Sequence, residues 1–185
     1  MSSAASADLV IGAAAPTFTL SDMSGKSVDL AQYKGKIVVL EWTNPACPYV
    51  VGHYANGNIP GMQKKYTDQG VVWLTINSTN PDNQGAKSNA EYIRIYSEWN
   101  AAMTANLRDA SGTVGKSYEA KTTPHMYVID KNGVLVYAGA IDDDRSTDGG
   151  ANAKTHYVAQ AIDELSAGKS VSIPETKPYG CSVKY

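Results

Sequence analysis

Two apolar runs stand out in the first half of the chain. The first covers residues 37–40 without interruption, and the second covers residues 71–76. Runs of this length, rich in Val, Leu and Ile, are typical of strands that are covered on both faces of a sheet. The pattern therefore predicts two buried strands at the centre of the fold.

Segments in which polar and apolar residues alternate lie before and after these runs. Residues 16–20 and 27–30 alternate in this way, which predicts a β-hairpin at the start of the fold. Residues 125–130 and 134–137 flank Asn132-Gly133. Because Asn-Gly suits the tight turn of a hairpin, these two segments are predicted to form a second one.

Apolar residues at helical spacing predict the helices. The first helix begins near residue 48, breaks at Asn56-Gly57 and restarts, so a helix in two parts is expected. Further helices are predicted over residues 91–99, 114–118 and 157–165. Strands that alternate with helices before a final hairpin predict an α/β fold with a mixed central sheet flanked by helices.

Neither end of the chain shows such periodicity. Residues 171–185 contain two prolines and Gly180 and are predicted to form an irregular C-terminal tail. Residues 1–15 are rich in Ala and Ser and are predicted to be a flexible tail, in which Ala5-Ser6-Ala7 has the pattern of a signal cleavage site. A trimmed signal peptide would mean an exported or periplasmic protein, whereas a plain tail leaves a cytoplasmic location open.

The composition indicates a globular chain. It has 185 residues, of which 43% are hydrophobic and 18% are charged, with a net charge of −2. A chain of this length and composition can bury a substantial core. The charge balance does not favour nucleic acid or an anionic membrane surface as a partner, and no apolar run has the length of a membrane-spanning helix.

Cys47 follows the first apolar run at the point where a helix is predicted to begin. Asn44-Pro45 ends the strand. Pro48 fits the first helical position, where its missing N–H would be unpaired anyway. Cys47 is then the N-cap, where free backbone N–H groups and the positive end of the helix dipole favour a thiolate. Since the thiolate is the reactive form, the sequence predicts redox chemistry at Cys47.

The second of the two cysteines, Cys181, lies in the C-terminal tail. Two cysteines are too few for a disulfide scaffold or a cysteine zinc site, but they suit one nucleophile and one resolving cysteine. As a resolver, Cys181 would attack a mixed disulfide or a sulfenic acid on Cys47, and Gly180 would let the tail move. As a permanent staple, it would stabilise the fold by about 5 kcal/mol. Both interpretations stay open, as does a bridge between chains.

The arrangement of strand, cysteine, helix and late hairpin resembles the thioredoxin-like superfamily over residues 16–166. The opening Ala15-Pro16-Thr17-Phe18-Thr19-Leu20, followed by Gly25-Lys26, is similar to the peroxiredoxin branch (alkyl hydroperoxide reductase and thiol-specific antioxidant proteins), which also holds exported thioredoxin-like reductases. In this register Cys47 takes the place of the nucleophilic cysteine. Val50 takes the place of the second cysteine, so the Cys-x-x-Cys motif is half missing.

The resemblance implies roles for further residues. Thr123 and Pro124 resemble the threonine and cis-proline that face the active cysteine, where the Thr123 backbone would pair with a substrate chain. Pro48 would line the same substrate-binding surface. Glu41 takes the place of a buried acid, and burial would raise its pKa and let it exchange a proton with Cys47 near neutral pH. The alternative is that Glu41 ends the strand facing water.

Several features depart from these families. Asn44 stands three residues before the cysteine, where peroxiredoxins have a threonine. Arg108 is the one candidate in the central region for the arginine that polarises the peroxide. Asp142-Asp143-Asp144 is expected to be a solvated acidic turn, because its spacing does not fit a calcium loop. The three histidines are expected to be surface or satisfied groups, so neither a metal site nor a cofactor is predicted.

The first hypothesis is therefore a thiol–disulfide oxidoreductase, with a thioredoxin-like domain over residues 16–170 and a C-terminal tail that carries the resolving Cys181. Cys47 is its nucleophile and Glu41 its proton carrier. The alternatives are a peroxiredoxin-like peroxidase with antioxidant activity and a non-catalytic protein with a structural disulfide. The expected partners are a protein or small-molecule disulfide, or a peroxide, and an external thiol reductant. The oligomeric state is left open.

Overall fold

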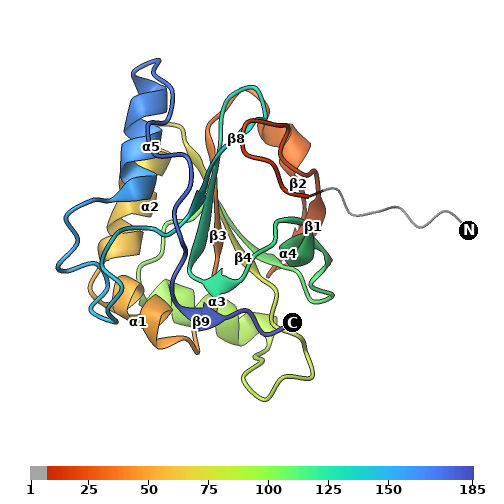
Figure 1. Ribbon diagram of the computed structural model, residues 1–185. Helices are drawn as coiled ribbons and strands as arrows, with labels where there is room; N and C mark the ends of the chain where they lie inside the picture. Colours follow the sequence, from red (N-terminus) through yellow and green to blue (C-terminus); the bar gives the residue numbers. More distant parts are fainter. Residues whose placement is uncertain (1–7) are drawn as a thin grey trace, which may run out of the picture.

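The computed structural model describes residues 8–185 and is built on a seven-stranded mixed sheet in the order β2-β1-β5-β4-β3-β7-β8 (Figure 1). Its strands are β1 (Thr19–Asp22), β2 (Ser27–Asp29), β3 (Val38–Trp42), β4 (Val72–Asn77), β5 (Ala105–Arg108), β7 (His125–Ile129) and β8 (Leu135–Gly139). A small second sheet pairs β6 (Thr122–Thr123) with β9 (Cys181–Ser182). The helices are η1 (Leu30–Tyr33), α1 (Pro48–Ala55), α2 (Asn58–Asp68), α3 (Asn89–Glu98), α4 (Thr113–Ser117) and α5 (Tyr157–Ser166). Within the described part of the chain, no helix is long and apolar enough to cross a membrane.

The two apolar runs of the sequence form β3 and β4 at the centre of the sheet. They pair in parallel, and β7 pairs antiparallel with the other edge of β3. Every residue of β3 and β4 is buried, as expected of strands that are covered on both faces. The predicted central strands and the predicted mixed sheet are confirmed.

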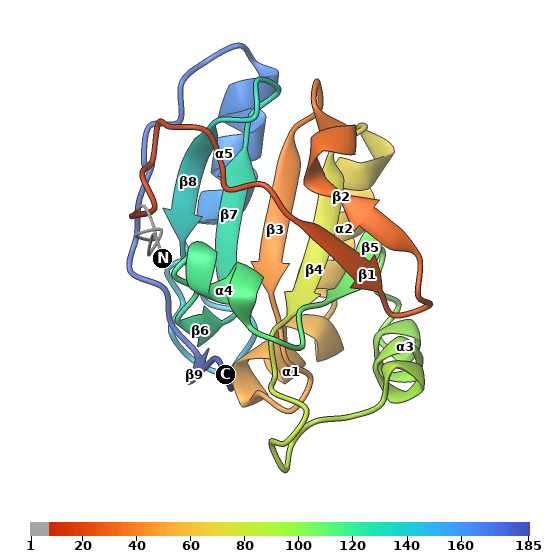
Figure 2. The same cartoon turned by 90° about the vertical axis from the view of Figure 1, so that its right-hand side faces the viewer.

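Two hydrophobic cores hold this sheet in place. Helices α1, α2 and α5, with Tyr96 of α3, cover one face, while η1, α4 and the chain before β1 lie on the other (Figures 1 and 2). Successive side chains of a strand point to opposite faces, so Val39 and Trp73 belong to the first core and Leu40 and Leu74 to the second. Since full burial of such a side chain stabilises by roughly 1.5–3 kcal/mol, both faces fix the strand that leads to Cys47.

The helix after Cys47 is broken where the sequence predicts it. Helix α1 ends at Ala55 and α2 begins at Asn58, with Gly57 between them at a φ of 79°. Because this left-handed conformation suits glycine, Gly57 allows the chain to turn and start a second helix. The predicted helix in two parts is confirmed.

The chain before β1 is bonded to the opposite end of the sheet. The Gly12 N–H donates to the carbonyl of Leu135 in β8 at 2.7 Å, and the Ala15 N–H donates to Gly133 in the turn between β7 and β8 at 2.9 Å. These bonds differ from the flexible tail predicted for residues 1–15, because they tie its second half to the sheet. The candidate cleavage site Ala5-Ser6-Ala7 lies outside the described residues.

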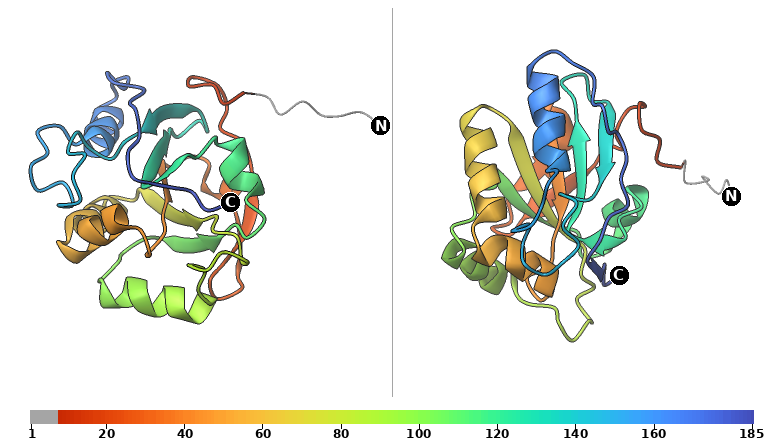
Figure 3. Two further views of the ribbon diagram at one scale, coloured as in Figure 1. Left: turned by 60° about the horizontal axis from the view of Figure 1, so that its bottom comes forward. Right: turned by 60° about the vertical axis from the view of Figure 1, so that its left-hand side comes forward.

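The C-terminal tail, residues 171–185, runs from α5 along the edge strand β8 toward the start of α1 (Figures 1 and 3). It is mostly irregular, as predicted, but Thr176 N–H donates to Ala138 at 3.1 Å and β9 pairs antiparallel with β6. The prediction of an irregular tail is wrong for β9. Tyr179 is buried and Cys181 packs against the first core, so side-chain burial outweighs the local turn signals.

Candidate active site

Cys47 ends the loop that leads from β3 to α1. Asn44 shapes this loop, because its side-chain Oδ1 accepts the Ala46 N–H at 2.9 Å and its carbonyl accepts the Cys47 N–H at 3.0 Å. Pro48 is the first residue of α1, and Cys47 is the N-cap with an extended backbone. The local sequence therefore sets the cysteine where it was predicted, at the positive end of a helix.

Strands β6 and β9 bring Thr123 and Cys181 beside Cys47. Thr123 and Cys181 are partners in the antiparallel pair, and the Cys47 thiol donates to the Thr123 carbonyl at 3.2 Å. The Thr123–Pro124 peptide bond is cis, as the resemblance implies. Cys47 is only 2% exposed, whereas Cys181 is partly exposed. Pro48 and Pro124 adjoin Cys47 and Thr123 in the chain, so they lie at the same place. Of the predicted site residues, Glu41 is the exception.

Hydrogen bonds favour the ionised form of Cys47. Burial alone would raise the pKa of its thiol, but the hydrogen bonds that the Cys181 thiol, the Thr123 hydroxyl and the Val50 N–H can give to a Cys47 thiolate outweigh burial, so the pKa lies below its ordinary value. The Thr123 hydroxyl is buried and has no partner among the described residues while Cys47 is a thiol. A Cys47 thiolate would give that hydroxyl an acceptor, which is a further reason for the thiolate to be stable here.

Cys181 has the opposite character. Burial, together with the hydrogen bond to Cys47 and the charge of Cys47, raises the pKa of the Cys181 thiol to about 11. Both cysteines are free thiols in this structure. When one of the two thiols ionises, these opposite shifts place the negative charge on Cys47 and leave the proton on Cys181.

Gly180 lets the tail approach Thr123 closely enough for this pairing. Its φ is 135°, and a Cβ at this position would lie 2.1 Å from the Thr123 carbonyl oxygen. Cβ atoms do not approach a carbonyl oxygen this closely, and L side chains rarely adopt such a φ. The close contact of Cys181 with Cys47 therefore depends on a residue without a side chain at position 180.

Replacing Gly180 by alanine is expected to lift the tail from Thr123. Backbone strain alone would lower the fraction of molecules with the tail packed against Thr123 by roughly tenfold to hundredfold. The contact between the new Cβ and the Thr123 carbonyl oxygen would lower it further. The measurement is the rate at which the Cys47–Cys181 disulfide forms from a mixed disulfide between Cys47 and glutathione, which we expect to fall, because this step needs the docked tail. Gly25→Ala is the matched control, because Gly25 also has a positive φ, 91°, but faces open space. Equal rates in the two variants would show that close docking at Gly180 is not needed.

Glu41 is the predicted site residue that does not touch Cys47. It is fully buried, and its carboxylate accepts bonds from Tyr54 Oη at 2.7 Å, Trp73 Nε1 at 2.8 Å and Gln63 Nε2 at 3.4 Å. Burial raises the pKa of Glu41 to about 7, although these donors oppose the rise. The alternative in which Glu41 faces water is wrong, because β3 is covered on both faces.

Two hydroxyls lie between Glu41 and Cys47. The hydroxyls of Thr43 and Tyr96 are 2.7 Å apart, and Thr43 also contributes to lowering the pKa of Glu41 by hydrogen bonding. Burial raises the pKa of Tyr96 well above its ordinary value, and the charges of Glu41 and Cys47 add to that rise. Tyr96 is thus near both acids, although among residues 8–185 no hydrogen bond joins Glu41 to Cys47 directly.

The groups that could serve a peroxidase are used elsewhere. Asn44 bonds within its own loop, as described above. The guanidinium of Arg108 donates to the carbonyls of Asn77, at 2.9 Å, and Thr79, at 2.5 Å. A guanidinium that is engaged by two backbone carbonyls is not presented to a peroxide at Cys47. The departures seen in the sequence therefore persist in the structure.

A second polar cluster, which sequence reasoning missed, lies under the tail. It consists of Asp142, Tyr179, His53 and Asn58, which hydrogen bond in a chain. The expectation of a solvated acidic turn at residues 142–144 is wrong for Asp142, which is 1% exposed, and for Asp144, which is also buried. The members of the cluster come from three separate parts of the chain, around residues 53–58, 142 and 179, so no local signal could have revealed them.

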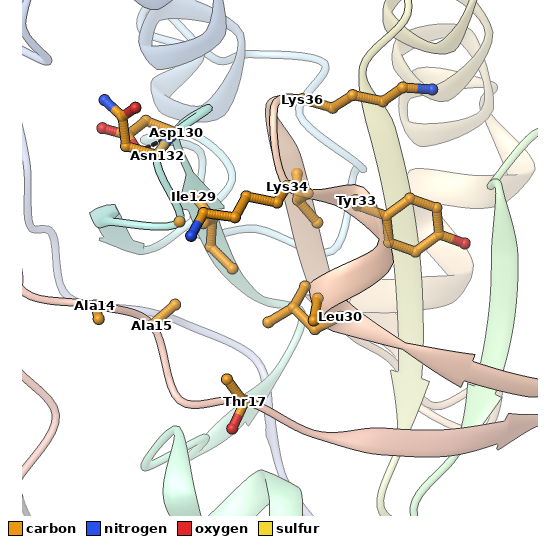
Figure 4. A pocket seen from close by; sticks show the side chains of 13 residues that line it. Ala14, Ala15, Thr17, Leu30, Tyr33, Lys34, Lys36, Ile129, Asp130 and Asn132 are labelled. Carbon is orange, nitrogen blue, oxygen red and sulfur yellow. Dashed lines mark hydrogen bonds between the residues drawn. The ribbon is translucent and has the colours of Figure 1, made fainter.

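A cavity of about 200 Å³ lies away from this site (Figure 4). It opens between the chain before β1, η1 and the end of β7, with Lys34 and Lys36 at its lining. Val38, the first residue of β3, lines the cavity, whereas Cys47 lies in the chain beyond Trp42, the last residue of β3. The cavity is therefore at the opposite end of the central strand and is not part of the cysteine site.

Comparison with curated proteins gives two groups of relatives. A thiol-disulfide oxidoreductase ResA from Geobacillus thermodenitrificans is 31% identical over 127 residues, which is 68% of this chain and 66% of that protein. A probable glutathione peroxidase 5 from Arabidopsis thaliana is 36% identical over only 59 residues, 32% of this chain and 33% of that protein. The chain thus spans about a third of the peroxidase and about two thirds of the oxidoreductase.

Solved structures extend the likeness to almost the whole chain. A hypothetical protein from Sinorhizobium meliloti is 26% identical with a TM-score of 0.84, covering 96% of both chains. An uncharacterized conserved protein from Geobacillus kaustophilus is 27% identical with a TM-score of 0.83, covering 97% of this chain and 94% of that one. Because these alignments cover 96% and 97% of the chain, they include at least part of the C-terminal tail, residues 171–185.

More distant structures agree on the fold. A thiol:disulfide interchange protein DsbE from Chlorobium tepidum, described as putative, is 21% identical with a TM-score of 0.56, covering 71% of this chain and 85% of that chain. The predicted thioredoxin-like fold is confirmed, and the relatives that match over about two thirds of the chain are named thiol-disulfide oxidoreductases. The family model described as "AhpC/TSA family" matches residues 11–138. The chain therefore belongs to the AhpC/TSA family.

Proposed function

We propose that the protein is a thiol–disulfide oxidoreductase whose redox pair is Cys47 and Cys181. The observation that carries the proposal is the position of the two thiols: Cys47 bonds to the Thr123 carbonyl, and Thr123 is the strand partner of Cys181. In this arrangement Cys47 has the lowered pKa and Cys181 the raised one. A low-pKa thiolate next to a protonated thiol is what the two steps of disulfide exchange require. The relatives that align over the greater length are also named thiol-disulfide oxidoreductases.

In the first step the Cys47 thiolate attacks one sulfur of a substrate disulfide. A Cys47–sulfur bond forms, the substrate's S–S bond breaks, and the departing thiolate takes up a proton. The Val50 N–H and the Thr123 hydroxyl hold the attacking charge before the bond forms. Pro48 and Pro124 flank Cys47 and are proposed to line the surface that the substrate meets.

In the second step Cys181 gives up its proton and attacks the Cys47 sulfur. The Cys47–Cys181 bond forms and the second half of the substrate leaves as a thiolate. The substrate has then gained two electrons from the cysteine pair, one proton from Cys181 and one proton from solvent. An external thiol reductant returns the pair to the dithiol. Because Cys181 already lies beside Cys47, this step is intramolecular and needs no large search.

Two further parts of the proposal concern the proton and the location. Glu41, with a pKa near 7, is proposed to exchange protons with the site through Thr43 and Tyr96. An exported location is proposed from Ala5-Ser6-Ala7, which lies outside the described residues. Supporting it, one fold neighbour with 23% identity is named a secreted disulfide oxidoreductase.

The test compares two oxidants. Reduced protein is mixed with equal concentrations of glutathione disulfide or hydrogen peroxide, and the products are identified by mass spectrometry after alkylation. We expect glutathione disulfide to produce the Cys47–Cys181 bond faster than peroxide, because the structure offers a thiolate and a resolver but no free arginine among the described residues near Cys47. Faster oxidation by peroxide, through a sulfenic acid on Cys47, would make the protein a peroxidase. If neither oxidant produces the Cys47–Cys181 disulfide, the proposed function is wrong.

A further inference from the structure

The polar cluster under the tail forms a directed chain of hydrogen bonds, which we call the Tyr179 chain. The Tyr179 hydroxyl donates to Asp142 Oδ1 at 2.5 Å, and His53 Nε2 lies 3.2 Å from the same hydroxyl. Asn58 Nδ2 lies 2.9 Å from His53 Nδ1. One assignment is consistent with all three bonds: Asn58 donates to His53, His53 donates to Tyr179, and Tyr179 donates to Asp142.

This chain depends strongly on the Tyr179 hydroxyl because it is buried. His53 is fully buried and Asp142 is 1% exposed. The second oxygen of Asp142, Oδ2, has no hydrogen-bond partner among the described residues. The Asp142 carboxylate therefore has only the Tyr179 hydroxyl and the Asp144 N–H, at 3.0 Å, to replace its lost hydration. Removing one of these two donors from a buried carboxylate is costly.

The loop that contains Gly150 packs over the Tyr179 chain and leaves no room for other hydrogen-bond partners of Asp142. A Cβ on Gly150 would lie 2.5 Å from Asp142 Oδ2 and 2.8 Å from Asn58 Nδ2, so the backbone of the loop closes directly onto these groups. The ring of Tyr179 also packs against Tyr49, with 5.9 Å between centroids. Tyr179 is consequently held both through its hydroxyl and through its ring, while the site around Asp142 is closed to solvent.

Tyr179 stands two residues before Cys181, on the segment that carries this thiol to Cys47. Cys47 is only 2% exposed, and Cys181 is among the groups that cover it. A disulfide larger than a few atoms can reach the Cys47 sulfur only when this part of the tail moves. Movement of the segment as a unit breaks the bond between Tyr179 and Asp142.

We propose that Asp142, Tyr179 and His53 are positioning residues that keep Cys181 seated against Cys47, and that breaking the Tyr179 chain sets how often the tail opens to admit a disulfide substrate. The inference rests on the proposed function, because it assigns these residues a part in the exchange cycle of Cys47 and Cys181. None of the three touches the reacting sulfurs by a hydrogen bond.

The test measures the opening of the tail directly. Reduced protein is treated with iodoacetamide, and alkylation of Cys47 is followed by peptide mass spectrometry. In Tyr179→Phe we expect Cys47 to react roughly tenfold to hundredfold faster, because a lost bond to a charged group raises the open fraction by about that factor. Tyr33→Phe removes a hydroxyl at the far cavity and serves as the matched control. Urea unfolding confirms that each variant is folded.

Variants of Asp142 separate positioning from general destabilisation. Asp142→Asn keeps an oxygen that can accept the Tyr179 hydroxyl but removes the charge, so its alkylation rate is expected to lie between those of the wild type and Tyr179→Phe, whereas Asp142→Ala is expected to behave like Tyr179→Phe. Unchanged alkylation in folded Tyr179→Phe and Asp142→Ala would overturn the inference. If instead the wild type forms no Cys47–Cys181 disulfide with glutathione disulfide, the proposed function fails, even where the alkylation rates respond as expected.

Discussion

Replacing Cys47 by serine is expected to reduce the turnover of glutathione disulfide to the background rate. The serine hydroxyl of such a variant would not ionise near neutral pH, whereas the donors around Cys47 hold the pKa of the thiol below its ordinary value. The remaining thiol, Cys181, is a poor substitute, because burial raises its pKa even when Cys47 is absent. The measurement is glutathione release under steady supply of a thiol reductant.

Replacing Cys181 by serine should stop the cycle after its first step. The substrate disulfide then reacts once, and one half of it stays bound to Cys47 because no second thiol displaces it. Mass spectrometry of Cys181→Ser should show one glutathione per chain, located on the peptide that contains Cys47. Ser182→Ala, on the exposed neighbour of Cys181 in β9, should retain turnover.

The opposite outcome would reverse the two roles. Cys181 is the more exposed thiol in the structure, so a substrate could meet it before it meets Cys47. A glutathione adduct on Cys181 in Cys47→Ser, formed as fast as wild-type turnover, would show that Cys181 faces the substrate and Cys47 resolves. The distribution of adducts between the two single variants therefore decides the assignment.

What the sequence could predict here depends on local signals. The strand β3 was readable from an apolar run, and the N-cap position of Cys47 from Pro48, because both are set by residues near each other in the chain. The break at Gly57 was readable for the same reason. These features fix the sheet and the position of the nucleophile.

The remaining parts of the site depend on contacts that no local pattern carries. Cys181 reaches Cys47 through pairing of β9 with β6, and the tail was predicted to be irregular. Asp142 was expected to be solvated, since a run of acidic residues usually is, but the hydroxyl of Tyr179 makes its burial possible. Packing of distant segments overrides local propensity at these positions.

Glu41 gives the stability of the protein an unusual pH dependence. Its pKa rises from 4.5 in a solvated chain to about 7 in the fold because of burial. Between these values the folded state holds a proton that the unfolded state has lost, so the stability falls as the pH rises. The full change is roughly 3 kcal/mol, at about 1.4 kcal/mol per pKa unit, and it is complete once the pH is above 7.

Two histidines change stability in the opposite direction and would hide this effect in the wild type alone. Burial lowers the pKa of His53 to about 4 and that of His125 to about 3. Below a pH of roughly 6.5 the unfolded state therefore binds protons that the folded state refuses, so these histidines make stability rise with pH. A difference between two variants cancels their contribution, since both proteins contain them.

Glu41→Gln is therefore expected to gain about 3 kcal/mol relative to the wild type as the pH is raised from about 4.5 to about 8. The amide cannot ionise, yet its oxygen can still accept from Trp73 and its NH₂ can donate to the Tyr54 hydroxyl, so the packing is kept. The measurement is the free energy of unfolding in urea at each pH. Glu98→Gln, on an exposed helical pair with Arg94, is the control and should show no such trend. A constant difference between Glu41→Gln and the wild type would mean that the buried carboxyl does not titrate in this range, and Glu41 would then be unsuited to exchange protons with Cys47 near neutral pH.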